Sequence, residues 1–307
     1  MIVTCSHDRN AFVWTNDGTT WKPSLVILRI DRAALDVKWS PDGKKFAVAS
    51  GSKCVPVCYF EAEHDWWVSK MIKKHKSTVT KVAWHPNSQL LATGSTDFKA
   101  RVFSTYVRQV DDAQDASTFP AAAFGEQCWE TGAHGWVNSV CWSPSGSALA
   151  WAGQDSSLSV VDFSGGVEAA SPDVLRFREL PMEDLLFCSE KCVVGVGHEM
   201  NPLVFSKKGS SWAFERKLEL KKEAKKVEAK AGGVAAARAL FQNRTDKGQD
   251  SAQATDTLDT THEASICCIK STCSDRTIRS FTTSGSDGKI AFWEMGELEL
   301  DMAALGL

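Results

Sequence analysis

Histidine and aspartate recur together along this 307-residue chain, and they are the residue types best suited to chemistry. In each pair the histidine stands 20-odd residues before the aspartate: His75 with Asp97, His134 with Asp155, and His262 with Asp287. One such pair beside a serine could form part of a hydrolase triad, in which a nucleophile, a base and an orienting acid converge. Three regularly placed copies instead indicate a structural device, because equivalent positions of repeated units are held apart in the fold. We therefore assign these residues, and Asp8 in an equivalent acidic turn, to structural turns.

Two pairs of cysteines could suggest metal ligands. Cys54 and Cys58, and likewise Cys188 and Cys192, are separated by three residues, a looser spacing than the two-residue knuckle of zinc sites. Neither has a second Cys or His pair in register, so the sequence predicts no metal site. It also offers no Gly-rich phosphate loop, His-Glu-x-x-His motif or nucleophile elbow. We therefore expect no enzymatic activity and no cofactor.

A short pattern predicts the strands that position the turns. Valine and tryptophan alternate with polar or small residues and lead into Pro followed by Asp, Asn or Ser at residues 37–43, 82–87 and 140–146. The alternation is typical of a strand with one buried face, and the end of the pattern is typical of a tight turn. A second strand rich in small apolar residues, an acidic turn and a third strand follow.

The third strands end on aromatic residues: Trp14, Phe60, Phe103, Phe163, Phe205 and Trp293. Their usual spacing of 40-odd residues, with four short strands in each unit, resembles the WD40 family of β-propellers. The resemblance implies an all-β fold in which the histidine and aspartate of a repeat hydrogen-bond across adjacent strands. Two spacings are longer, because they contain an extra loop at 107–130 and a segment at 217–261 without strand alternation.

Composition limits the class of protein. The apolar share of 43% and the charged share of 24% fit a soluble globular protein, and the 12 tryptophans favour strands. A net charge of −3 disfavours a general nucleic-acid or membrane-surface binder. Neither a signal peptide nor an apolar stretch of about 18 residues occurs. We expect a cytoplasmic protein without membrane insertion, whose ten cysteines are reduced.

The segment at 217–261 contains two distinct parts. Residues 221–230 carry five lysines and two glutamates, which leaves open a nucleic-acid or lipid patch but favours a solvated helix, because the glutamates are interleaved at spacings near four. Residues 234–243 have high helix propensity and end in the apolar pair Leu240-Phe241. Such a pair needs a partner surface, either on the propeller or on another molecule.

Residues 237–247, together with the stretches at 21–30, 65–68 and 84–88, resemble the WD-repeat subunit of the actin-related protein 2/3 complex. The likeness runs from residue 3 to about 296. It implies a scaffold in the actin cytoskeleton, with the other subunits, the actin filament and nucleation-promoting factors as partners. It also implies that the insertion in the last blade contacts actin through Arg238, Leu240, Phe241, Gln242, Asn243, Asp246 and Lys247.

The expected organisation is one propeller over residues 1–297 and a tail at 298–307. Its units are a partial blade at 1–22, blades at 23–62, 68–105, 132–165, 172–216 and 262–297, and a helix-bearing insertion at 217–261. The family has seven blades, so the resemblance implies that the first blade and part of the second are missing here. We expect an internal start or a truncated end at Met1 rather than an open ring, because uncovered sheet edges invite aggregation.

Two other functions stay open at this level. A WD-repeat adaptor of another assembly, of the ubiquitin-ligase or chromatin type, would share the repeats but not the stretches at 21–30 and 237–247. An enzyme built on a propeller would need acid, base or metal-binding groups that converge at the central channel. The sequence places none of these in register.

Overall fold

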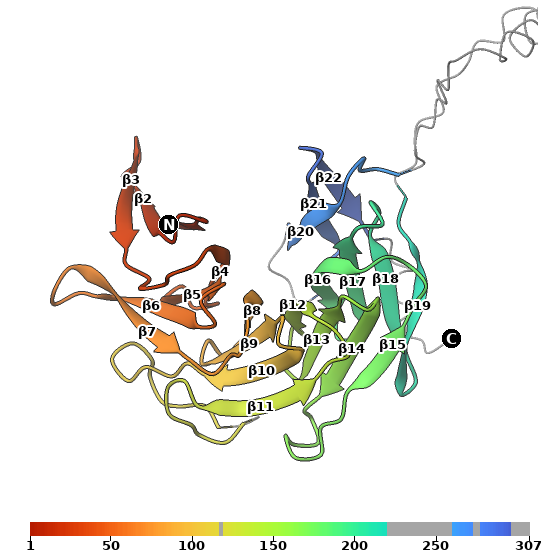
Figure 1. The fold of residues 1–307 in the computed structure, drawn as a ribbon, viewed down its shortest axis with the longest axis horizontal. Coiled ribbons are helices and arrows are strands. Elements are labelled where there is room, and N and C mark those ends of the chain that lie inside the picture. Colours follow the sequence, from red (N-terminus) through yellow and green to blue (C-terminus); the bar gives the residue numbers. More distant parts are fainter. Residues whose placement is uncertain (117–118, 220–259, 273–276, 296–307) are drawn as a thin grey trace, which may run out of the picture.

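The computed structural model describes residues 1–116, 119–219, 260–272 and 277–295, and every regular element among them is a β-strand. The strands form six antiparallel sheets in chain order (Figure 1). The first three sheets contain β1 (Ile2–Cys5), β2 (Ala11–Asn16) and β3 (Trp21–Val26); β4 (Ala34–Trp39), β5 (Lys45–Ser50), β6 (Val55–Glu61) and β7 (Trp66–Ile72); β8 (Val79–Trp84), β9 (Leu90–Ser95), β10 (Lys99–Ser104) and β11 (Gln127–Gly132). The last three contain β12 (Val137–Trp142), β13 (Ala148–Gly153), β14 (Ser157–Asp162) and β15 (Asp173–Arg176); β16 (Met182–Ser189), β17 (Cys192–Gly197), β18 (Leu203–Lys208) and β19 (Ser211–Lys217); β20 (Ile266–Ser271), β21 (Ser280–Gly285) and β22 (Ile290–Glu294).

The sheets are arranged around a common centre as an arc (Figure 1). Their innermost strands β4, β8, β12, β16 and β20 contact one another in this order. A cluster of buried apolar side chains fills each of the five spaces between consecutive sheets. The all-β propeller predicted from the sequence is thereby confirmed, with six blades in the described residues. The seventh blade that the resemblance implies is not among them.

Among the described residues, the two sheets at the ends of the arc each pack one face against a neighbouring sheet. In the third sheet, both faces of β10 are covered, and Val102 and Phe103 are each 0% exposed. In the sixth sheet, Trp293 of β22 packs toward the fifth sheet, whereas its neighbour Phe292 is 69% exposed. The first sheet likewise covers the second with one face and leaves Leu25 of β3 53% exposed on the other. Apolar side chains therefore face solvent at both ends of the arc.

The observed sheets are offset by one strand from the predicted blades. Trp21–Val26, most of which was assigned to a blade starting at residue 23, pairs with β2 and completes the first sheet. In the same way β7, β11 and β15 pair with the strand before them rather than with the sheet that follows. Strands that follow one another in the chain are usually neighbours in a sheet, and each third strand here takes the next strand as its outer partner, whether the connection is the short turn 62–65 or the longer stretch 105–126. The sheets therefore differ from the predicted units by one outer strand at 62/68, 105/132 and 165/172.

One of the aromatic residues expected to close a third strand lies near the end of β6, as expected, but does not belong to the core. Phe60 is 43% exposed, whereas Cys58, two residues earlier on β6, is fully buried and lies opposite Phe46 of β5. The rings of Phe46 on β5 and Trp67 on β7 have centroids 5.3 Å apart, so large side chains of the two neighbouring strands pack together here. A core conserves total volume rather than the residue type at one position, and the large residues here stand on neighbouring strands.

The loop between β10 and β11, residues 105–126, contacts three sheets. On one side, Asp111 forms a buried ion pair with Lys45 of β5 in the second sheet. On the other, Phe119 is 2% exposed and its ring centroid lies 4.9 Å from that of Phe163 in the fourth sheet. The loop thus ties the second and fourth sheets to the third, from which it emerges.

Candidate functional site

The sixth sheet contains a complete hydrogen-bonded turn cluster. Nδ1 of His262 lies 3.2 Å from both carboxylate oxygens of Asp287, and its Nε2 lies 2.9 Å from Oγ1 of Thr283. The indole Nε1 of Trp293 donates to the same threonine oxygen at 2.8 Å. Asp287 also accepts the backbone N–H of Glu263 at 2.9 Å, and this bond is the main cause that lowers the pKa of Asp287 to about 2. The hydrogen bonds of the cluster connect the residues before β20 with β21, β22 and the turn between them.

The third sheet brings His75 and Asp97 into the same turn but does not join them. Nε2 of His75 lies 2.9 Å from Oγ1 of Thr93, while its Nδ1 has no hydrogen-bond partner among the described residues. The carboxylate of Asp97 is occupied instead by Arg101, whose Nη1 lies 2.9 Å from Oδ2. Burial lowers the pKa of His75 to about 4, and the nearby charge of Arg101 adds to this effect. The expected His75–Asp97 bond is therefore absent, because the guanidinium competes for the acid.

The fourth sheet does not bring His134 and Asp155 together. His134 is exposed, and its ring makes no hydrogen bond to Asp155 within the part of the chain that the structure describes. Oδ1 of Asp155 instead accepts from Oγ of Ser157 at 2.6 Å. The reason lies in spacing. His75 and His262 stand four residues before the first residue of their inner strands, whereas His134 stands only three before Val137.

Asp8 occupies an exposed turn between β1 and β2. Its Oδ1 accepts the backbone N–H of Asn10 at 3.0 Å, and this hydrogen bond is the main cause that lowers the pKa of Asp8. The contact fixes the local turn and engages no other strand.

These positions do not form a catalytic constellation. His75, His134 and His262 belong to the turns of three different sheets, so the described structure does not gather them at a common centre. Among the described residues, no group of three or more His, Cys, Asp or Glu side chains is placed to hold a metal ion. Cys54, Cys58, Cys188 and Cys192 are buried, and burial raises the pKa of Cys58 to about 12. The cysteines thus act as small apolar core residues.

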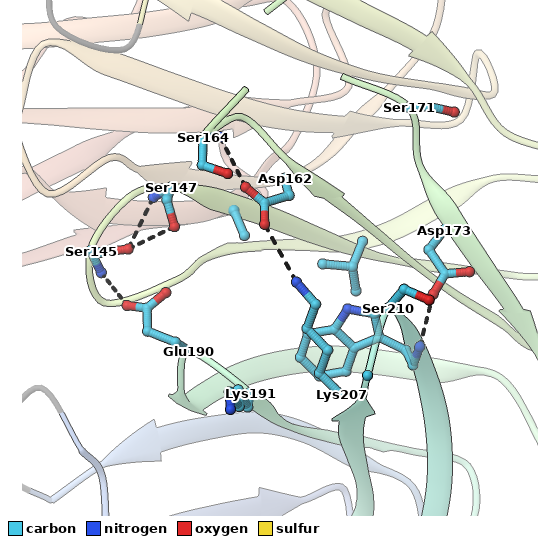
Figure 2. A pocket seen from close by; sticks show the side chains of 14 residues that line it. Ser145, Ser147, Asp162, Ser164, Ser171, Asp173, Glu190, Lys191, Lys207 and Ser210 are labelled. Atoms are coloured by element: carbon cyan, nitrogen blue, oxygen red, sulfur yellow. Dashed lines mark hydrogen bonds and ion pairs between the residues drawn. The ribbon is translucent and has the colours of Figure 1, made fainter. Parts of the chain in front are cut away.

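A pocket of about 530 Å³ lies between the fourth and fifth sheets (Figure 2). It is bordered by the turn between β12 and β13, the end of β14, the start of β15, and the hairpin turns of the fifth sheet. Figure 2 shows Asp162 facing Lys207, with Asp173 and Glu190 on either side of this pair. Nothing in the sequence patterns indicated this pocket, because its residues come from four separate turns and follow no motif.

The residues expected to contact actin, Arg238, Leu240, Phe241, Gln242, Asn243, Asp246 and Lys247, lie outside the described residues. So does most of the insertion expected at 217–261, of which the structure describes only 217–219 and 260–261.

No helix among the described residues has the length and apolar character that crossing a membrane requires. A family model described as "WD domain, G-beta repeat" matches residues 66–104 and 125–162, which correspond to parts of the second, third and fourth sheets.

Three similar proteins align with nearly the whole chain. Actin-related protein 2/3 complex subunit 1A of Arabidopsis thaliana is 44% identical over 98% of this chain and 81% of its own length. Subunit 1A-B of the same complex from Xenopus laevis is 42% identical over 97% of the chain and 80% of its own length. Subunit 1 from Saccharomyces cerevisiae is 34% identical over 95% of the chain and 80% of its own length. The chain folds as a WD-repeat propeller, and over nearly its whole length it is similar to plant, animal and fungal relatives. It therefore belongs to the family of actin-related protein 2/3 complex subunit 1.

Proposed function

We propose that this protein is a non-catalytic scaffold subunit of an actin-related protein 2/3 complex in the cytoplasmic actin cytoskeleton. The observation that carries the proposal is the 44% identity to the Arabidopsis thaliana subunit over 98% of the chain. The geometry agrees with a scaffold role. Five continuous apolar clusters hold the sheets together, and the histidines and acids of the described turns are used in strand contacts or lie in separate turns.

Affinity purification of the tagged protein from its own cells, followed by mass spectrometry, tests the proposal. Actin-related proteins should copurify in stoichiometric amounts, together with the remaining subunits of one complex. Copurification of ubiquitin-ligase or histone-binding subunits in their place would reject the assignment. A protein recovered alone would reject it as well.

The insertion at 217–261 is proposed to supply the contact with the side of an actin filament, in an assembly that nucleation-promoting factors activate to form branches. The resemblance of residues 237–247 to the family supports this role. An aromatic side chain buried at the centre of an interface can contribute about 2 kcal/mol or more to binding, which makes Phe241 the residue to test.

The variant Phe241→Ala should weaken cosedimentation of the assembled complex with filaments at least about tenfold, since 1.4 kcal/mol corresponds to a factor of ten in affinity. Assembly of the complex should be unchanged. Thr245→Ala, in the same segment but outside the proposed contact set, is the matched control. Equal cosedimentation of the two variants would contradict the contact role without affecting the scaffold assignment.

A further inference from the structure

The pocket between the fourth and fifth sheets exists because one outer strand is short. β15 has four residues, whereas β7, β11 and β19 have six or seven. Its pairing with β14 reaches only as far as Val160, which lies opposite Asp173. Val161 and Asp162, the last two residues of β14, therefore have no outer strand beside them. Of these two residues only Asp162 is exposed, since Val161 is 0% exposed, so the opening beside the end of β14 is limited to Asp162.

The pocket has an apolar floor. Ala148, Val160 and Trp212 line it, and each is more than nine-tenths buried, at 7%, 5% and 6% exposure. They belong to the tightly packed cluster between the fourth and fifth sheets, so this floor is rigid rather than adaptable. A floor of this kind receives the aliphatic part of a side chain.

The rim of the pocket carries an excess of acid. Asp162, Asp173 and Glu190 face Lys191 and Lys207, which leaves a net charge of −1. Lys207 lies 3.4 Å from Asp162 and offsets its charge.

Asp173 and Glu190 are held in place by backbone contacts. Oδ2 of Asp173 accepts the N–H of Trp212 at 2.8 Å, and Oε1 of Glu190 accepts the N–H of Ser145 at 2.7 Å. Each of these bonds uses one carboxylate oxygen, and Figure 2 draws no interaction at the second oxygen of either side chain.

We propose that this pocket binds an extended segment of a partner protein through a lysine or arginine side chain. The aliphatic stem lies on Val160 and Trp212, and the cationic head reaches Asp173 and Glu190. An anionic ligand such as a phosphate is disfavoured, because three carboxylates border the site. The inference rests on the proposed function in one respect: the partner is another subunit of the same complex.

The test uses the double variant Asp173→Asn with Glu190→Gln, which removes both charges but keeps the oxygens that accept the N–H groups of Trp212 and Ser145. Its affinity for a complex reconstituted without this subunit should fall about tenfold or more, and the loss should shrink as salt is added. The matched control is Glu168→Gln, an exposed acid on the same β14–β15 connection that does not line the pocket. Unchanged thermal unfolding of each variant shows that the fold is retained.

A zero-length carbodiimide crosslinker supplies a second readout. In the assembled complex it should join Asp173 or Glu190 to a lysine of another subunit, and the crosslinked peptide should disappear in the double variant. Should wild-type protein assemble normally while the double variant binds like the control, the pocket proposal is overturned and the scaffold assignment stands. Failure of the wild-type protein to assemble at all would instead overturn the proposed function.

Discussion

Nζ of Lys45 lies 2.6 Å from each carboxylate oxygen of Asp111, and both side chains are almost completely buried, with exposures of 0% and 3%. Lys45 stands at the start of β5, and Asp111 in the loop at 105–126. The lysine also donates to the carbonyl of Thr105 at 3.2 Å, and Asp111 accepts the N–H of Val107 at 2.6 Å. A single ion pair therefore fixes the loop of one blade to the core of the blade before it.

Replacing Lys45 by Met should lower the free energy of unfolding by roughly 3–5 kcal/mol, because it leaves the carboxylate of Asp111 buried without its counter-charge. Chemical denaturation measures the effect. Lys22→Met serves as the control, since Lys22 pairs with Asp17 at 2.9 Å on the surface, where its own side chain is 70% exposed. Adding Asp111→Leu to Lys45→Met should recover part of the loss, since an apolar pair removes the uncompensated charge. A Lys45→Met protein as stable as the Lys22→Met protein would show that the buried pair does not tie the loop down.

His75 should give the protein a pH-dependent stability between about pH 6.5 and pH 4. Burial, reinforced by Arg101, lowers the pKa of His75 from 6.5 to about 4. The unfolded chain binds this proton at higher pH than the folded protein does, so the free energy of unfolding should fall as pH drops through that window, by on the order of 2 kcal/mol. In His75→Gln this part of the dependence should be missing, whereas His64→Gln, at an exposed histidine, should retain it. If the free energy of unfolding changed with pH in the same way in the wild type and in His75→Gln, His75 would not be the source of the dependence.

Asp287 should make the free energy of unfolding depend on pH in a more acidic range than His75 does. The N–H of Glu263, together with further contacts, lowers the pKa of its carboxyl from 3.8 to about 2. The stabilisation by the ionised form is complete above about pH 4 and is lost as pH falls toward 2. Asp287→Asn should therefore unfold more easily than the wild type at neutral pH, and the difference should narrow below pH 4. The comparison needs urea denaturation at several acid pH values, and a difference that is constant with pH would count against it.

Gly146→Ala should destabilise the contact between the third and fourth sheets. Gly146 has a φ of +81°, and a Cβ atom there would overlap the ring of His85, whose Nε2 lies 3.1 Å from the Gly146 carbonyl oxygen. The expected loss is on the order of 2 kcal/mol. Gly166→Ala isolates the backbone contribution, since Gly166 has a φ of +93° but open space around its Cβ position, and it should cost about 1 kcal/mol. Equal losses in the two variants would mean that the overlap with His85 is relieved by a small shift.

The positions of the inner strands can be predicted from the sequence, because apolar alternation and turn residues are properties of short stretches of chain. The stretches at 37–43, 82–87 and 140–146 each give an inner strand and its turn where they were expected. The predicted units place β7 and β15 with the strands that follow them and leave most of β11 in the loop at 107–130, because apolar alternation identifies a strand but not the strand with which it pairs. The position of the loop at 105–126 could not be predicted at all, because its contacts to Lys45 and Phe163 join residues far apart in the chain.

The turn clusters show why a recurring pair of histidine and aspartate in the sequence does not by itself predict a hydrogen bond between them. His262 meets Asp287, yet Arg101, four residues after Asp97, takes the acid that His75 would need. At the corresponding position after Asp287 the residue is Ala291, which cannot compete. The spacing of His134 to Val137 was a visible signal that this histidine falls out of register. The competition by Arg101 depends on side-chain geometry that no spacing rule contains.

The stack of sheets forms an arc, and local unfolding should begin at the two sheets at its ends. Each interior blade is held by neighbours on both sides, whereas in the part of the chain that the structure describes the first and sixth sheets each pack against a single neighbouring sheet. In a stack stabilised by nearest-neighbour contacts, local opening is easiest where a neighbour is lacking. Amide hydrogens of β2 and β21 should therefore exchange with solvent sooner than those of β9 and β13, with protection rising toward the middle of the stack. Any molecule that covers the exposed face of either end sheet would slow that exchange first at the end it touches.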